Sequence, residues 1–141
     1  MSARILVVDD EANIRALIEE ILSEEGYSVT TAADARDARA ARAAQEFDLI
    51  LLDIWMPDTD RISLLREWAE SGAGGTVVMM SGHGTVDTAV EATRLGAVDF
   101  LEKPVSLAKL LRTVEKALAL RRGKEARRGA AVRNEIGRAH V

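Results

Sequence analysis

The feature that most constrains the fold is an uninterrupted apolar run, Leu49-Ile50-Leu51-Leu52, which ends on Asp53. A strand that faces solvent on one side alternates apolar and polar residues, whereas a strand covered on both faces is apolar throughout. The run therefore predicts a central strand of a parallel sheet. It also places the Asp53 carboxylate at the carboxyl end of that strand.

Short apolar segments alternate with helical patterns along the rest of the chain. The predicted strands are Arg4–Val8, Ser28–Ala32, Leu49–Asp53, Thr76–Met80 and Val98–Leu101. The predicted helices comprise one over Ile14–Leu22 that Gly26 ends, one from an Asp34 cap to Gln45, one with Leu64, Leu65 and Trp68 that ends near Gly72, one over Val86–Leu95, and one after Ser106. Five strands alternating with five helices predict an α/β, three-layer, doubly wound parallel sheet.

Composition and charge narrow the class of protein further. The 141 residues, 48% of them hydrophobic and none of them cysteine, suit one domain in a reducing compartment. No apolar run approaches the roughly 20 residues of a membrane span, so we expect a soluble, cytoplasmic protein. Residues 1–120 carry 12 basic and 21 acidic side chains. This acidic balance argues against nucleic-acid binding by the main domain.

The last segment, residues 121–141, carries 7 basic and 2 acidic side chains and loses the apolar periodicity. We expect a folded domain over 1–120 and, over 121–141, a helix extension or linker followed by a disordered tail. The final Glu135–Val141 looks like translated vector or sequencing-adapter DNA, so we expect it to have no part in the function.

Polar residues follow four of the five predicted strands. They are Asp9, Asp10, Asp53, Ser81 and Lys103. Because the carboxyl ends of parallel strands meet at one edge of the sheet, we expect these side chains to share a rim.

Three clustered carboxylates repel one another, and their pKa values rise unless a cation joins them. A cluster with oxygen ligands alone suits a hard ion, Mg²⁺ or Mn²⁺. Lys103 adds a positive charge that can hold a phosphoryl oxygen, and Ser81 adds a hydroxyl. The set suits in-line phosphoryl transfer to a carboxylate oxygen.

Each of these residues also has a simpler interpretation. Asp9-Asp10 could cap the helix that starts near Glu11, Ser81 could be a turn hydroxyl, and Lys103 could be a solvated lysine. Phe100 reads as a core residue and His83 as a surface loop residue. Their joint placement on one rim favours a site.

The order of these motifs looks like the receiver domain of two-component response regulators, over residues 4 to about 120. The resemblance rests on Asp9-Asp10, Asp53 with Pro57, Ser81-Gly82, Phe100 and Lys103-Pro104. The segments Asp53–Asp60 and Ser81–Thr85 further resemble regulators of the nitrogen-regulation type. The resemblance implies a flavodoxin-like (βα)5 fold with strand order 2-1-3-4-5.

The same resemblance implies a role for each motif residue. Asp53 would accept a phosphoryl group from a phosphohistidine on a sensor histidine kinase. Asp10, Asp53 and the backbone carbonyl of Trp55 would bind Mg²⁺ directly, and Asp9 would hold a metal-bound water.

Three further roles follow from the resemblance. Lys103, with a cis peptide bond to Pro104, would contact the phosphoryl group. Ser81 would be the switch hydroxyl, and Phe100 the switch aromatic. Trp55 and His83 would flank the site.

In the nitrogen-regulation type the receiver precedes an ATPase domain and a DNA-binding domain, so we expect transcription regulation through a region outside these residues. The protein would be a regulatory domain that catalyses only its own phosphorylation and dephosphorylation. A homodimer could form through the face made by the Val86–Leu95 helix, the Val98–Leu101 strand and the last helix. We expect no contact with a membrane.

One departure and two rival interpretations remain. Arg61 stands where most receivers have a glycine with positive φ, which costs about 1–2 kcal/mol for another residue, so we expect weaker Mg²⁺ binding or lower stability.

A haloacid-dehalogenase-like phosphatase would need an Asp where Trp55 stands. A pseudo-receiver that binds partners without phosphorylation is the other alternative.

Overall fold

One parallel sheet organises the part of the chain that the computed structural model describes, which is residues 3–53, 63–64, 66–67, 76–82, 90, 93–94 and 96–121. Its strands are β1 (Arg4–Val8), β2 (Ser28–Ala32), β3 (Leu49–Asp53), β4 (Thr76–Ser81) and β5 (Asp99–Glu102). They pair in parallel in the order β2-β1-β3-β4-β5. The predicted fold class and strand order are confirmed.

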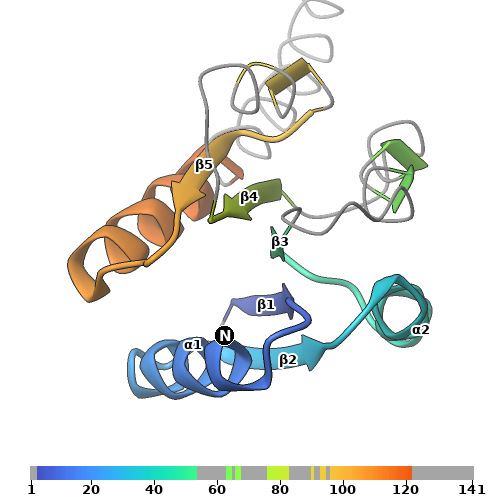
Figure 1. The fold of residues 1–141 in the computed structure, drawn as a ribbon, viewed down its shortest axis with the longest axis horizontal. Helices are drawn as coiled ribbons and strands as arrows, with labels where there is room; N and C mark the ends of the chain where they lie inside the picture. The colour runs from blue at the N-terminus through green and yellow to red at the C-terminus, as the bar shows by residue number, and fades with distance from the viewer. Residues whose placement is uncertain are drawn as a thin grey trace, which may run out of the picture.

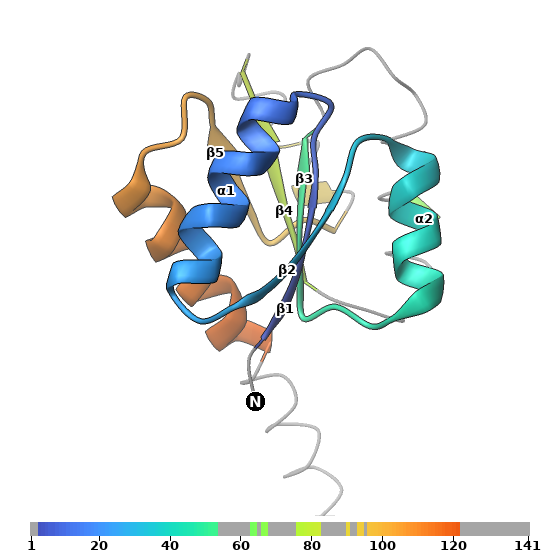
Figure 2. The same cartoon turned by 90° about the horizontal axis from the view of Figure 1, so that it is seen from below.

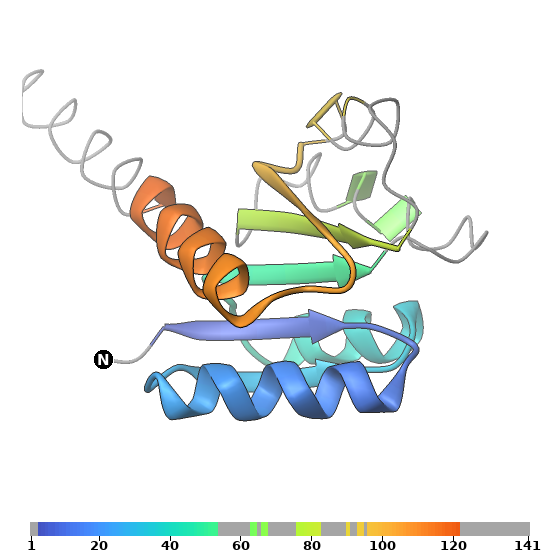
Figure 3. The ribbon, with the colours of Figure 1, turned by 60° about the vertical axis from the view of Figure 1, so that its left-hand side comes forward.

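Helices cover both faces of this sheet. Helix α1 (Ala12–Glu24) and the helix at 107–121 lie on one face, and α2 (Ala35–Ala44) lies on the other (Figures 1 and 2). The arrowheads of β1, β3 and β4 point the same way in Figure 3, so their carboxyl ends meet at one edge. None of the helices in the described part of the chain has both the length and the apolar character of a bilayer span.

The third and fourth predicted helices are described only in part. Residues 63–64, 66–67, 90 and 93–94 are helical. Glu67 pairs with Arg39 of α2 at 2.8 Å, which puts the third helix beside α2. Gly96 has a φ of 106°, and its N–H donates to the carbonyl of Thr93, so the fourth helix ends directly after the predicted range Val86–Leu95. The predicted end near Gly72 lies outside the described residues.

The core divides into two layers because successive strand residues point to opposite faces. Leu6, Ile50 and Leu52 pack with the α2 side, while Ile5, Leu49 and Leu51 pack with α1 and the helix at 107–121. All five residues of β3 are buried. Each such large apolar side chain contributes about 1.5–3 kcal/mol when it is removed from water. The apolar run thus sets the centre of the sheet, as predicted.

Local signals fix the helix ends. Gly26, with a φ of 92°, ends α1, and its N–H and that of Tyr27 donate to the carbonyls of Ser23 and Leu22. This is the Schellman arrangement, which glycine favours. Asp34 caps α2 by accepting the N–H of Asp37 at 2.8 Å. The predicted stop of α1 at Gly26 and the predicted start of α2 at Asp34 are both confirmed.

The last two strands differ from the prediction by one residue at their ends. β4 continues to Ser81, and β5 covers Asp99–Glu102 instead of Val98–Leu101. The reason is the pairing: Ser81 is the register partner of Glu102, and the Lys103 N–H donates to the Ser81 carbonyl at 2.8 Å. Ser81 therefore lies within the strand, and Lys103 follows β5 directly.

Candidate functional site

The carboxyl ends of β1 and β3 bring the predicted carboxylates together. Val8 and Leu52 are register partners, so the residues that follow them along the two strands are neighbours. One carboxylate oxygen from each of Asp9, Asp10 and Asp53 lies within 4.8 Å of the others. Asp9 and Asp53 are fully buried, while Asp10 is exposed. The predicted acidic rim is present.

Lys103 supplies the positive charge at this rim. Its Nζ lies 2.6 Å from Asp9 Oδ2, 3.2 Å from Asp53 Oδ2 and 3.5 Å from Glu11 Oε1, and its side chain is 10% exposed. Burial by itself lowers the pKa of the Lys103 ammonium, but the carboxylates of Asp9 and Asp53 outweigh burial and hold this pKa above its ordinary value. The lysine therefore stays charged and offsets part of the negative charge of the two buried carboxylates.

Asp9 is held through all of its polar groups. Its N–H donates to the Ala32 carbonyl, and its own carbonyl accepts from Arg15 Nη1 at 2.6 Å. Asp9 Oδ1 accepts the Glu11 N–H at 2.8 Å, and Oδ2 accepts from Lys103. The N-cap residue of α1 is Glu11, so Asp9 binds the N–H of the residue that precedes the helix and does not itself cap α1. Its role in a metal site stays a prediction.

Sequence reasoning missed the contacts of Glu11 and Arg15. Glu11 faces Lys103 from a half-exposed position, and Arg15 reaches back from the first turn of α1. Helical spacing could have predicted these contacts. Arg15 lies four residues after Glu11, so both side chains are on the same side of α1 at its start.

The other predicted residues lie on the neighbouring strands. Ser81 is buried at the end of β4. Phe100 is half-buried in β5 and packs against the core layer on the α2 side, where its register partner is Met79. The peptide bond between Lys103 and Pro104 is cis, as the resemblance implied.

Several predicted features lie outside the described residues. They are the Trp55 carbonyl, Pro57, Arg61, Trp68, His83 and the tail over 122–141.

The donor set fits a hard divalent cation. The three clustered side chains offer carboxylate oxygens alone, which Mg²⁺ and Mn²⁺ prefer. The exposed Asp10 gives the cluster a side open to solvent, whereas Asp53 is buried beside an ammonium. The three carboxylates can bind a divalent cation. The Lys103 ammonium beside Asp53 can reduce the repulsion between the Asp53 carboxylate and an approaching anionic group.

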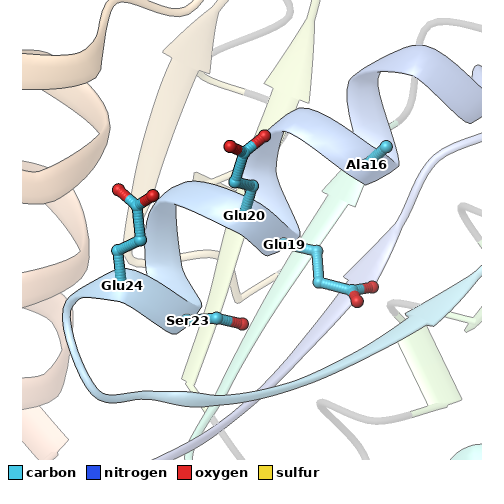
Figure 4. Close-up of a pocket in the computed structure, with 5 residues that line it drawn as sticks. All are labelled: Ala16, Glu19, Glu20, Ser23 and Glu24. Carbon is cyan, nitrogen blue, oxygen red and sulfur yellow. The ribbon is translucent and has the colours of Figure 1, made fainter.

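A shallow depression on the outer surface of α1 is separate from the rim. It is lined by Ala16, Glu19, Glu20, Ser23 and Glu24. Glu20 and Glu24 point to the same side of the helix, and Glu19 points to the other (Figure 4). The depression contains none of the rim residues and is therefore not part of the candidate site. Its three glutamates make this outer surface of α1 acidic.

Comparison with known proteins agrees with this geometry. The pattern of the response regulator receiver domain matches residues 5–115. The nitrogen assimilation regulatory protein NtrX of Azorhizobium caulinodans is 45% identical over 120 residues, which are 84% of this chain and 26% of the relative. The transcriptional regulatory protein FixJ of Bradyrhizobium diazoefficiens is 36% identical over 94% of this chain and 63% of its own length.

A solved structure with the same fold is the receiver domain of NtrX from Brucella abortus. It is 46% identical with a TM-score of 0.75, over 82% of this chain and 98% of that one. The chain thus spans about a quarter of the length of the NtrX relative, and nearly all of an isolated receiver domain.

Proposed function

The chain belongs to the family of response regulator receiver domains, and from this we propose that it is a switch in which Asp53 accepts a phosphoryl group. The family consists of regulatory domains of two-component systems and not of classical enzymes. The observation that carries the proposal is the position of Asp53: it is fully buried at the end of β3, 3.2 Å from Lys103 Nζ and clustered with Asp9 and Asp10. An Asp53 oxygen would attack phosphorus, and the bond from phosphorus to the donor histidine nitrogen would break.

Mg²⁺, or Mn²⁺ in its place, would be held by Asp10, Asp53 and the Trp55 carbonyl. When bound, the cation supplies positive charge that reduces repulsion between an incoming phosphoryl group and the carboxylates. Asp9 would act through a bound water, which agrees with its two oxygens already accepting from Glu11 and Lys103.

Lys103, Ser81 and Phe100 would report the phosphorylated state. Lys103 Nζ already lies 3.2 Å from Asp53 Oδ2 and would contact an oxygen of a phosphoryl group on Asp53. Ser81 would move its hydroxyl toward the same group, and Phe100 would turn inward behind it. The two switch residues lie on paired strands, β4 and β5, so a movement at one can reach the other.

The partner on the input side would be a sensor histidine kinase. Its docking surface would include α1 near Ile14 and Leu17, and Leu17 is 50% exposed. The output would be transcription regulation through an ATPase and DNA-binding region beyond the span of this chain. The acidic receiver itself would bind neither nucleic acid nor membrane, and it would act in the cytoplasm.

A homodimer would form through the fourth helix, β5 and the helix at 107–121. Sedimentation velocity before and after activation tests this. A rise in mass is expected, and an unchanged mass would refute the dimer.

Tryptophan fluorescence tests the phosphoacceptor, since Trp55 is two residues from Asp53. Mg²⁺ and then beryllofluoride, a phosphoryl analogue, should change the emission, and Asp53→Asn should abolish the second change. A folded protein with no response would favour the pseudo-receiver. The variant Arg61→Gly would then separate a pseudo-receiver from a site weakened by Arg61, because only the latter would regain the response.

A further inference from the structure

Arg15 lies across the start of α1 from inside its first turn. Its backbone N–H donates to the Glu11 carbonyl at 3.1 Å, so the residue belongs to the helix. Its side chain turns back, and Nη1 donates to the Asp9 carbonyl at 2.6 Å. The hydrogen bond thus connects Arg15, in the first turn of α1, to Asp9, the first residue of the turn Asp9–Glu11 that precedes the helix.

The turn that carries Asp10 is held at both of its ends. At one end the Asp9 carbonyl is bound by Arg15, and at the other the Glu11 N–H is bound by Asp9 Oδ1 at 2.8 Å. Asp10, whose side chain is exposed, lies between these two contacts. In this turn shape the Asp10 carboxylate clusters with Asp9 and Asp53.

We infer that Arg15 is a positioning residue that fixes the turn Asp9–Glu11 and thereby sets the affinity of the acidic rim for a divalent cation. The inference rests on the proposed function, because it assumes that the rim binds Mg²⁺. Arg15 would touch neither the cation nor the phosphoryl group and would act through the backbone of Asp9.

Removing Arg15 would change the Mg²⁺ affinity in opposite directions, depending on whether its charge or its contact with the Asp9 carbonyl matters more. A cation near the rim repels Mg²⁺, so losing the guanidinium charge alone would tighten binding. Losing the contact that fixes the turn would weaken binding, and removing partners that orient metal ligands typically costs 10–100-fold in affinity. The direction of the change therefore identifies the cause.

The test is a Mg²⁺ titration of the whole chain followed by amide NMR. Arg15→Gln should bind Mg²⁺ about tenfold more weakly than the unaltered protein, and Arg15→Lys should recover part of the affinity, since an ammonium can donate one hydrogen bond. The matched control is Arg112→Gln, which removes the same charge from an exposed position on the helix at 107–121 and should leave the affinity unchanged.

A second measurement does not depend on the metal. Without Mg²⁺, the amide of Glu11 should exchange faster in Arg15→Gln than in the unaltered protein and in Arg112→Gln.

Equal or tighter Mg²⁺ binding by Arg15→Gln, or unchanged exchange at Glu11, would overturn the role of Arg15 and leave the proposed function standing. An unaltered protein that shows no Mg²⁺ response would overturn the proposed function together with this inference.

Discussion

Replacing Lys103 by methionine should lower the stability of this domain strongly when no divalent cation is present. The change removes the ammonium that lies 2.6 Å from Asp9 Oδ2 and 3.2 Å from Asp53 Oδ2, and both aspartates are fully buried. At an effective dielectric constant of about 20, the two attractions amount to about 6 and about 5 kcal/mol. Desolvation of the charges offsets much of this gain, and breaking such a buried pair costs about 3–5 kcal/mol.

Urea denaturation followed by circular dichroism at neutral pH, in the presence of a chelator, measures the loss. The control is Lys109→Met, which removes an exposed lysine from the helix at 107–121 and should change stability by at most about 0.5 kcal/mol. Added Mg²⁺ should restore more stability to Lys103→Met than to the unaltered protein, because the variant has no competing ammonium.

The stabilisation that Lys103 provides should decrease as the solution becomes alkaline. The folded-state pKa of Lys103 is raised, so its contribution to stability is fully present below the unfolded lysine pKa of about 10.4 and is lost as pH rises through the folded value. The difference in stability between the unaltered protein and Lys103→Met should therefore be constant from neutral pH to about pH 10 and shrink in more alkaline solution. Equal stability of Lys103→Met and Lys109→Met at neutral pH would show that the Lys103 ammonium does not stabilise the two buried aspartates.

Three further predictions concern residues away from the rim, each checked by urea denaturation. Asp34→Ala should cost about 1 kcal/mol, because the side chain caps α2 by accepting an amide N–H at 2.8 Å; Asp34→Asn should keep most of that stability. Gly26→Ala should also cost about 1 kcal/mol. Its φ is 92° and nothing lies within 4 Å of an added Cβ, so a much larger loss would contradict a purely backbone cause. Asp48→Asn retains an acceptor for the Arg4 N–H but loses the charge that faces Arg121 at 3.4 Å, so it should cost no more than about 1 kcal/mol.

The sheet could be predicted because its strands are buried on both faces. Leu49–Leu52 has no polar position, and that pattern fits few places other than the centre of a parallel sheet. The ends of β4 and β5 were each misplaced by one residue. The apolar pattern alone does not predict that a polar residue such as Ser81 belongs to the strand. The end of β4 is fixed by the pairing of Ser81 with Glu102 of β5.

The membership of the rim could be predicted as well, because it follows from strand ends. The individual contacts could not. Two contacts depend on side-chain directions: Lys103, after β5, lies closer to Asp9 than to Asp53, and Arg15 reaches back across the turn Asp9–Glu11 to the Asp9 carbonyl. Sequence spacing narrows these directions but does not choose among rotamers.

Intact-protein mass spectrometry with a small phosphoramidate donor tests most directly whether Asp53 accepts a phosphoryl group in a cation-dependent reaction. We predict a gain of one phosphoryl group when Mg²⁺ is present, no gain with a chelator, and none in Asp53→Asn, with fragmentation placing the group on Asp53. A folded protein that gains no phosphoryl group with Mg²⁺, or an Asp53→Asn variant that gains it as readily, would show that Asp53 is not the cation-dependent phosphoacceptor.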